Sequence, residues 1–264
     1  MQGESQAPGP EGAARVVEQR ANRTLIPNVP LNEAKRLATP TEDQELLRRE
    51  DSRSAEFPQS DAWRVLRIQG EFVSGFDTLA KVNAAVSFFG SARVTEADPL
   101  YAQAVELARR LSEDGFAVIT GGGPGFMEAA NRGASEVDGI SIGCNIELPF
   151  EQGTNRFVDV SLNFRYFFVR KTMFVKYSEA FVIFPGGFGT LDELFEALTL
   201  IQTGKIQNFP VILFGSAYWR GLLNWIKGTL LAEGKISPED LDLLVVTDDI
   251  EEARRTIVSC YQKL

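Results

Sequence analysis

The chain has 264 residues, 44% of them hydrophobic, and carries a formal net charge of −9. Its length and apolar content suffice for one large α/β domain with an extension, and its acidic balance argues against a general nucleic-acid or anionic-membrane surface. The sequence contains no histidine, which excludes Ser-His-Asp and Cys-His nucleophilic machinery and removes the commonest metal ligand. Acid–base chemistry must then come from Asp, Glu, Lys, Tyr or Cys.

The two cysteines, Cys144 and Cys260, lie far apart and lack the paired spacing of a metal site. We interpret both as buried thiols in a reducing compartment. Met1–Pro10 has no basic-then-apolar signal pattern, and no apolar run approaches the roughly 18 residues needed to span a bilayer. We therefore expect a cytoplasmic protein that binds a small molecule and has neither a nucleic-acid nor a membrane partner.

Residues 1–58 hold six of the twelve prolines, few large apolar side chains and many charges of both signs. Such a composition buries too little surface to offset the entropy of ordering. This predicts a mobile N-terminal extension over 1–58 and a folded domain over 59–264. Within the extension, Thr41 and the acidic residues after it favour a local helix over Thr41–Arg53, which has few apolar anchors and is expected to dock weakly.

The folded domain begins with a pattern typical of a packing helix. From Asp61 onward, apolar residues recur roughly every three to four positions, at Trp63, Leu66, Val73, Phe76 and Leu79. Gly70 and Gly75 weaken the middle of this stretch, so we expect two helical pieces. We predict that they cover an edge of the domain or a partner subunit.

Apolar strands then alternate with helices through the rest of the chain. Strands are predicted at Ala84–Phe89, Phe116–Thr120, Ile140–Asn145, Ala180–Phe184, Pro210–Phe214 and Leu244–Thr247. Helices are predicted at Pro99–Glu113, Gly125–Ser135, Arg165–Tyr177 after a loop-rich stretch, beyond Gly189, at Tyr218–Leu231 and at Glu251–Tyr261. This alternation indicates the α/β class, a Rossmann-like doubly wound parallel sheet with helices on both faces. Ligands of such sheets bind beyond the carboxyl ends of the strands.

One predicted strand stops at Pro185, where the most informative turn of the chain begins. Gly186, Gly187 and Gly189 allow backbone angles and close approaches that a Cβ would block, so their N–H groups can converge on an anion. Thr190 follows as the predicted N-cap of a helix whose positive dipole end faces the same anion. Strand, glycine turn and helix N-terminus together predict a phosphate site.

Glu193 stands in the first turn of this predicted helix, where two interpretations compete. Thr190-x-x-Glu193 fits a capping box, in which the Glu side chain reaches back to the Thr backbone N–H. The same position also places a carboxylate close to the sugar of a bound nucleotide. Position along the chain does not separate capping from catalysis, so both interpretations stay open at this point.

Two further turns end other predicted strands. Gly121-Gly122-Gly123-Pro124-Gly125 leads into a helix that carries Glu128, and Gly90-Ser91-Ala92-Arg93 follows the first strand. The second of these could bring backbone N–H groups and a hydroxyl to the same sheet edge, although an ordinary strand-to-helix loop explains it equally well. The candidate substrate-binding residues in these two regions are Gly90, Ser91, Gly122, Gly123 and Glu128.

Neither glycine-rich turn fits the common nucleotide fingerprints. Read as G-x-G-x-x-G, the turn from Gly121 has Phe126 where the third glycine belongs, and the turn from Gly187 has Asp192 there. This disfavours NAD or FAD binding. A G-x-x-x-x-G-K-[ST] run does not occur either, which excludes a P-loop nucleotide hydrolase.

The stretch Phe164–Met173 is aromatic and basic, with adjacent charges at Arg170 and Lys171 inside a strongly apolar helix. A guanidinium in a largely buried helix needs an anionic partner, because burying an unpaired charge is very costly. That partner could be a bound substrate. The alternative is a salt bridge to a structural carboxylate.

Taken together, these motifs resemble those of the Lonely Guy (LOG) family of cytokinin-nucleotide phosphoribohydrolases. The resemblance rests on Arg170-Lys171, on Pro185-Gly186-Gly187-Phe188-Gly189-Thr190-Leu191-Asp192-Glu193 and on Gly121-Gly122-Gly123-Pro124-Gly125-Phe126-Met127-Glu128. It extends from about Ala84 to Ile250 and is similar to the longer bacterial branch. Members have often been labelled possible lysine decarboxylases, but the sequence shows no pyridoxal-binding signature.

The resemblance implies hydrolysis of the N-glycosidic bond of a nucleoside 5′-monophosphate, without a metal or organic cofactor. It places the catalytic arginine at Arg170 and the catalytic glutamate at Glu193. Lys171 and the turn residues Gly186, Gly187, Gly189 and Thr190 are then expected to bind the substrate. It also implies a homodimer or higher homo-oligomer with sites near the interface.

Departures from the short plant-type pattern leave undecided which nucleotide base the protein accepts. Ala92 stands where a second serine is common, and Phe167 stands where a methionine often precedes the Arg-Lys pair. AMP is therefore an option beside a cytokinin riboside monophosphate. A noncatalytic carrier of a nucleotide or phosphorylated cofactor is the main rival, because related sheets bind such ligands without cleaving them.

Overall fold

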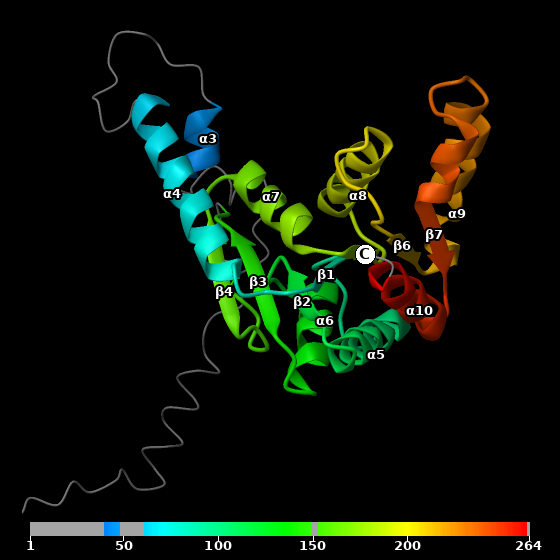
Figure 1. Cartoon of the computed structure of the whole chain (residues 1–264), viewed down its shortest axis with the longest axis horizontal. Coiled ribbons are helices and arrows are strands. Elements are labelled where there is room, and N and C mark those ends of the chain that lie inside the picture. The colour runs from blue at the N-terminus through cyan, green and yellow to red at the C-terminus, as the bar shows by residue number, and fades with distance from the viewer. Residues whose placement is uncertain (1–39, 48–60, 149–152, 263–264) are drawn as a thin grey trace, which may run out of the picture. The chain divides into compact units, whose positions relative to one another are not determined.

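A seven-stranded, all-parallel sheet forms the centre of the computed structural model, in the order β4-β3-β2-β1-β5-β6-β7 (Figure 1). The structure describes residues 40–47, 61–148 and 153–262. The strands are β1 Ala85–Phe89, β2 Ala117–Thr120, β3 Ser141–Ile146, β4 Val160–Phe164, β5 Ala180–Ile183, β6 Val211–Phe214 and β7 Leu244–Thr247. The predicted α/β class and parallel sheet are confirmed.

Helices connect the strands and cover both faces of the sheet. They are α3 Glu42–Leu46, α4 Asp61–Leu79, α5 Pro99–Glu113, α6 Phe126–Ser135, α7 Phe167–Tyr177, α8 Phe188–Gln202, α9 Ser216–Trp225 and α10 Ile250–Tyr261. The π-helix η2 (Ile226–Leu231) continues α9, and the 3-10 helix η3 (Pro238–Leu243) precedes β7. None of the helices in these described ranges has the length and hydropathy needed to cross a bilayer.

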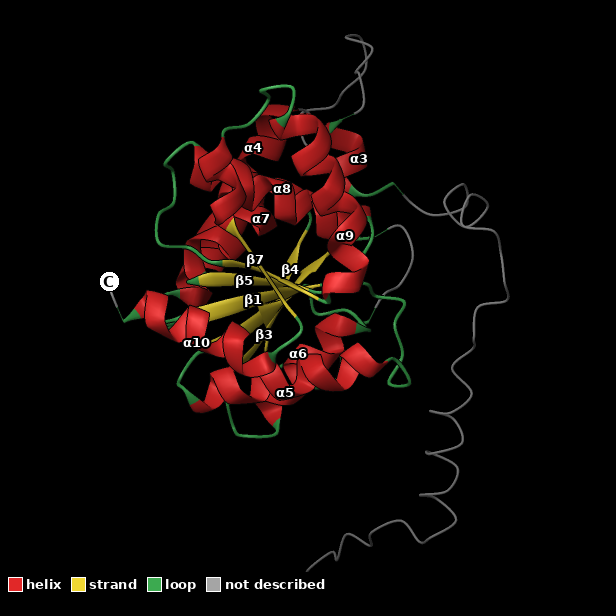
Figure 2. Cartoon of the chain, turned by 90° about the vertical axis from the view of Figure 1, so that its right-hand side faces the viewer, coloured by secondary structure: helices red, strands yellow, loops and turns green. Residues whose placement is uncertain are grey.

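The two faces of the sheet bury separate apolar clusters. Helices α5, α6 and α10 pack on one face, and α4, α7, α8 and α9 pack on the other (Figure 2). Alternate residues of β1 supply the two sides, since Val86 and Phe88 join the first cluster whereas Ala85 and Phe89 join the second. This is why the central strands read as continuous apolar runs in the sequence.

One strand was absent from the expectations. The stretch before α7, predicted to be rich in loops, contains the edge strand β4, which pairs in parallel with β3. Its burial alternates, with Ser161 and Asn163 exposed and Leu162 and Phe164 buried. A short edge strand covered on one face carries polar residues, so it lacks the wholly apolar run that marks a central strand.

Helix α4 is continuous, which corrects the prediction of two pieces. It runs through both Gly70 and Gly75 without a break. A Cβ at Gly75 would lie 2.8 Å from Sδ of Met173, so this glycine lets α4 approach α7 closely. Packing against α7 thus outweighs the low helix propensity of glycine.

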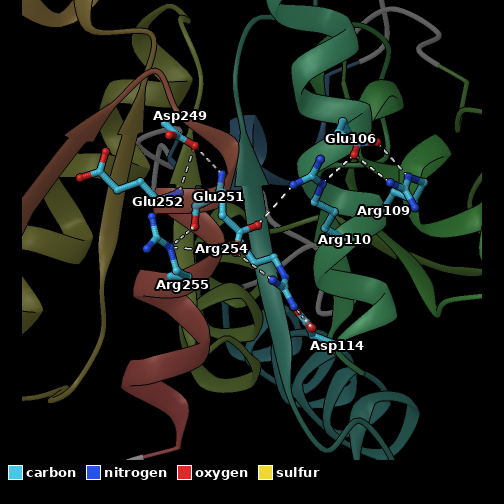
Figure 3. A network of polar contacts seen from close by, with 9 residues as sticks. All are labelled: Glu106, Arg109, Arg110, Asp114, Asp249, Glu251, Glu252, Arg254 and Arg255. Carbon is cyan, nitrogen blue, oxygen red and sulfur yellow. Dashed lines mark hydrogen bonds and ion pairs between the residues drawn. The ribbon is translucent and has the colours of Figure 1, made fainter.

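Ion pairs join the C-terminal helix α10 to α5 on the face opposite α7 (Figure 3). Arg254 donates from Nε and one terminal nitrogen to the two carboxylate oxygens of Asp114, both at 2.6 Å. Arg110 contacts Glu251 at 3.3 Å, and Arg254 contacts the same carboxylate at 3.0 Å. The paired geometry fixes orientation more than a single exposed ion pair would.

Candidate active site

Three turns meet at the carboxyl edge of the sheet, around the point where β1 lies between β2 and β5. The Ser91 N–H donates to the Pro185 carbonyl at 2.9 Å, and the Phe126 N–H donates to the Ser91 carbonyl at 3.2 Å. The turn after β1 therefore bridges the two glycine-rich turns. This edge is the switch point of the sheet, where the strand order reverses direction.

A cleft of about 980 Å³ opens over these turns. The predicted site residues that line it are Gly90, Ser91, Gly123, Arg170, Gly186, Gly187, Gly189 and Thr190. Aromatic side chains from three helices, Phe167, Phe188 and Tyr218, also line it. Its volume lies at the upper end of the range for small-molecule sites.

Helix α8, which follows the glycine turn after β5, begins earlier than expected. Its N-cap is Gly187, whose carbonyl accepts hydrogen bonds from the N–H groups of Thr190 (3.1 Å) and Leu191 (3.0 Å). Thr190 is thus inside the first turn of α8, and the prediction that it is the N-cap was wrong. Among the described residues, no atom lies within 4 Å of a Cβ placed at Gly187 or Gly189, so the backbone is open to a ligand at these two positions.

This helix start also removes the capping-box interpretation of Glu193, which lies in the second turn of α8. Its side chain is 3% exposed, and its Oε2 is buried without a hydrogen-bond partner in the described part of the chain. Lys171 Nζ lies 3.5 Å from that oxygen. Burial raises the pKa of Glu193 to about 7, although Lys171 and Arg170 oppose the rise. A carboxyl in this state can exchange a proton near neutral pH.

Arg170 carries a cation into the cleft from α7. Its guanidinium lies over the rings of Phe167 and Phe174, with centroid distances of 4.9 and 5.6 Å. Its Nε is buried without a hydrogen-bond partner, and within the described ranges it makes no ion pair. Burial lowers the pKa of Arg170, and the nearby Glu193 charge counteracts this. The structural salt bridge considered as an alternative is therefore not formed, and the guanidinium remains available to an anion.

Lys171 points to a different set of groups from its neighbour Arg170. Its ammonium lies 3.1 Å from Asp192, close to Glu196 and 3.5 Å from Glu193. It does not line the cleft, because successive helical residues project about 100° apart. In this structure Lys171 neutralises the acidic face of α8.

Gly122 and Glu128 also lie away from the cleft surface. Gly122 has a φ of 71°, and a Cβ there would lie 2.2 Å from Oδ1 of Asn145. Glu128 is half-buried on α6, where its charge acts on Tyr101 of α5. The structure gives Gly122 a conformational task in the turn.

Two residues that hold the turns were absent from the sequence-based candidates. Asn155 Nδ2 lies within hydrogen-bond distance of the Gly122 carbonyl (3.2 Å), the Gly123 carbonyl (3.0 Å) and Asn131 Oδ1 (2.9 Å). The Tyr218 hydroxyl donates to the Gly186 carbonyl at 2.6 Å. Asn131, a polar residue on the buried side of α6, was the only local signal of this network.

Comparison with known proteins follows the same motifs. The family model described as "Possible lysine decarboxylase" matches residues 127–257. The cytokinin riboside 5′-monophosphate phosphoribohydrolase of Mycobacterium tuberculosis is 31% identical over 165 residues, which cover 60% of this chain and 88% of that protein. The chain belongs to the Lonely Guy (LOG) family. The plant LOG member LOG3 of Arabidopsis thaliana is 34% identical over 99 residues, covering 36% of this chain and 45% of its own length.

Solved structures share the architecture of this LOG-family chain. The Moco carrier protein of Chlamydomonas reinhardtii superposes with a TM-score of 0.50 at 22% sequence identity, covering 68% of this chain and 98% of that one. At this level the likeness concerns the fold.

Proposed function

We propose that this protein hydrolyses the N-glycosidic bond of nucleoside 5′-monophosphates, releasing the free base and ribose 5-phosphate. The observation that carries the proposal concerns two charged groups near an open glycine turn. The buried carboxyl of Glu193 interacts electrostatically with the guanidinium of Arg170, which forms no ion pair among the described residues and lines the cleft with Gly187 and Gly189. The names of the relatives from M. tuberculosis and A. thaliana support the same reaction.

The 5′-phosphate would bind at the turn Gly186–Thr190. The backbone is open at Gly187 and Gly189, and the turn leads directly into the N-terminus of the 15-residue helix α8. A helix N-terminus preceded by glycines favours a phosphate, because unpaired N–H groups and the helix dipole both attract negative charge. Ser91, on the neighbouring turn, lines the same cleft and would add a hydroxyl.

The ribose would then reach Glu193, which lies one helical turn beyond Thr190 on the same side of α8. As the C1′–N bond breaks, positive charge develops on the sugar, and a carboxylate stabilises it. Water supplies the oxygen that forms the new bond to C1′, and its proton balances the departing base. Glu193 would orient this water or the ribose hydroxyls.

Arg170 would anchor the substrate or the departing base through charge-assisted hydrogen bonds. A guanidinium is too weak an acid to serve comfortably as the proton donor. Its place over Phe167 and Phe174 restricts its motion, so binding costs less side-chain entropy than a free arginine would need.

A panel of nucleotides tests the reaction and identifies the base. Purified protein is incubated with AMP, N6-isopentenyl-AMP, GMP, CMP and UMP, and base and ribose 5-phosphate are followed by chromatography. We expect release from at least one, with AMP and its N6-isopentenyl analogue as the leading candidates. Binding of a nucleotide without release from any of the five would favour a noncatalytic carrier.

A single substitution tests the role of Glu193. Glu193→Gln keeps the shape and removes the charge, so we expect nucleotide binding to persist while turnover falls by about 100-fold or more. Glu196→Gln is the matched control, because it lies one turn further along α8 and shares the Lys171 contact. Equal turnover in the Glu193→Gln variant and wild type would leave Glu193 without a catalytic role.

We further propose a homodimer or higher homo-oligomer, as the family resemblance implies. Exposed aromatic side chains surround the cleft, with Phe188 92% exposed and Phe167 42% exposed. Exposed apolar groups of this size are common at interfaces. Light scattering coupled to size-exclusion chromatography would give the oligomeric state, and a monomer at all concentrations would refute this part.

A further inference from the structure

The N-terminus of α7, the helix that carries Arg170, is capped by side chains from distant parts of the chain. Its own N-cap residue, Tyr166, makes no side-chain cap hydrogen bond. Asp43 of α3 accepts a hydrogen bond from the Phe167 N–H at 3.0 Å. Both carboxylate oxygens of Glu71 of α4 lie 3.1 Å from the Arg165 nitrogen, which donates to them. Asp43 thus binds a backbone N–H group that the N-terminus of α7 leaves unsatisfied, and Glu71 binds the backbone N–H of the residue just before the N-cap.

The capped turn is also the turn that fixes Arg170. The Arg170 N–H donates to the Tyr166 carbonyl at 3.3 Å. This hydrogen bond links the backbone of Arg170 directly to the N-cap residue of α7. The Arg170 guanidinium lies 4.9 Å from the centroid of the Phe167 ring. Asp43 therefore holds the amide of the residue whose ring supports the guanidinium.

Contacts on either side keep α3 in place over α7. Thr41 and Gln44 form a capping box that closes its first turn. Glu42 forms an ion pair with Arg67 of α4 and lies 3.4 Å from the Tyr166 hydroxyl. These contacts direct the Asp43 carboxylate to the start of α7, although the sequence alone predicted weak docking for this segment.

Charge favours the same arrangement. Burial raises the pKa of Asp43 and lowers that of Arg170, and the charge of each residue opposes the shift of the other. The carboxylate also suits the positive end of the α7 dipole. The negative charge of Asp43 thus stabilises the positive charge of the Arg170 guanidinium.

We propose that Asp43 and Glu71 are positioning residues for Arg170, holding the first turn of α7 so that the guanidinium faces the cleft. The hydrogen bonds described above support the positioning of Arg170. The expected effect on turnover rests in addition on the proposed function. It assigns a task to the segment Pro40–Leu47, which lies outside the region of family resemblance.

The test compares Asp43→Ala, Asp43→Asn and Glu71→Gln with wild type in the full-length protein. Asp43→Ala removes the acceptor for the Phe167 N–H, whereas Asp43→Asn keeps an acceptor oxygen and loses the charge. The matched control is Asp77→Ala, which removes an exposed carboxylate from α4. The readouts are hydrogen exchange at the Phe167 and Arg170 amides, ribose 5-phosphate affinity by calorimetry, and kcat and KM for whichever nucleotide is cleaved.

We expect Asp43→Ala to accelerate exchange at both amides and to weaken ribose 5-phosphate binding and kcat/KM by about tenfold, as loss of a charged helix cap and a displaced anchor would do. Asp43→Asn should recover most of the exchange protection, and Glu71→Gln should fall between the two. Asp77→Ala should match wild type. The conservative variant separates positioning from a general loss of stability.

An unchanged rate of hydrogen exchange at the Arg170 amide in Asp43→Ala would overturn the inference. Faster exchange at that amide with the same ribose 5-phosphate affinity and the same turnover as wild type would overturn it as well. Equal effects in Asp77→Ala would overturn it too. A wild-type protein that binds ribose 5-phosphate but cleaves no nucleotide would refute the proposed function alone. Hydrogen exchange needs neither ligand nor turnover, so it decides the structural claim in every case.

Discussion

The two glycine-rich turns at the cleft, Gly121–Gly125 after β2 and Pro185–Gly189 after β5, look alike in sequence and are held in different ways. In the first turn a Cβ at Gly122 or Gly125 would lie 2.2 Å from a neighbouring oxygen, and both residues have a φ of 71°. In the second turn a Cβ at Gly187 or Gly189 would meet no atom within 4 Å. Glycine serves conformation and packing in the first turn. In the second turn Gly186 makes room for the Thr190 side chain, and Gly187 and Gly189 leave the backbone accessible.

The helices that follow the turns differ in the same sense. In the turn before α6, the Thr120 side chain binds the Gly122 N–H, and the Asn155 side chain binds the Gly122 and Gly123 carbonyls. Helix α8 instead buries a carboxyl oxygen of Glu193 that has no hydrogen-bond partner among the residues that the structure describes. Such a group is costly to bury, and costs of this kind concentrate at functional sites. The first turn is therefore held by internal hydrogen bonds, whereas the helix after the second turn carries the carboxyl group to which we assign the proposed chemistry.

Substituting Gly125 should break the first turn and give the largest loss of stability. In Gly125→Ala the new Cβ would meet the Ser91 carbonyl oxygen at 2.2 Å in a left-handed conformation, so we expect a loss of about 3 kcal/mol or more in the free energy of unfolding. Urea unfolding measures it. Gly70→Ala, in open space within α4, should be neutral or slightly stabilising, and a similar small effect in Gly125→Ala would contradict the comparison.

Removing the Glu193 charge should stabilise the protein. Because its pKa rises from 4.5 to about 7 on folding, the folded protein binds this proton more tightly, and the free energy of unfolding falls as the pH rises through that interval. Glu193→Gln should then exceed wild type by roughly 3 kcal/mol near pH 8 and by much less near pH 5. Urea unfolding at both pH values tests this, and a gap that does not grow with pH would count against it.

Asn155→Ala should destabilise the first turn by removing the side chain that binds its carbonyl groups. It removes hydrogen bonds to the Gly122 and Gly123 carbonyls and to Asn131, so we expect a loss of about 2 kcal/mol in the free energy of unfolding. Asn155→Asp, which keeps the size but removes the donors, should lose a comparable amount. Unaltered stability in both variants would show that this network does not hold the turn.

Gly187→Ala should act on binding and leave stability nearly unchanged. The site has space for the methyl group in the free protein, and the cost of alanine at an N-cap is about 1 kcal/mol or less. A phosphate drawn close to the backbone would meet that methyl, so ribose 5-phosphate affinity should fall by about tenfold, measured by calorimetry. Gly221→Ala on α9 is the control and should bind normally.

The sequence predicted those elements whose signal is local. Strands β1, β5 and β6 are buried on both faces, and each was located to within one residue by its apolar run. The edge strand β4 was not predicted, because the exposed residues Ser161 and Asn163 interrupt its apolar run. Long-range pairing with β3, which no local pattern carries, defines it.

The site divides in the same way. The glycine turns and Arg170 were located by motif, and the structure brings them to one cleft. The task of Lys171 was missed because its partners lie on another helix, and Asn155 was missed because it acts on a turn more than 30 residues away. The start of α8 was misjudged because the hydrogen bonds that define it begin at a glycine carbonyl, which carries no side-chain signature.

The position of β1 in the sheet has a consequence for how the protein assembles. One edge of β1 pairs with β2 and the other with β5, so the cleft spans the junction between β1–β4 and β5–β7. During synthesis, the turns after β1 and β2 are made with the segment β1–β4, and the turn after β5 is made later, with the segment β5–β7. A binding site therefore arises only when the later segment docks, and a ligand bound across the junction would protect that docking against thermal unfolding.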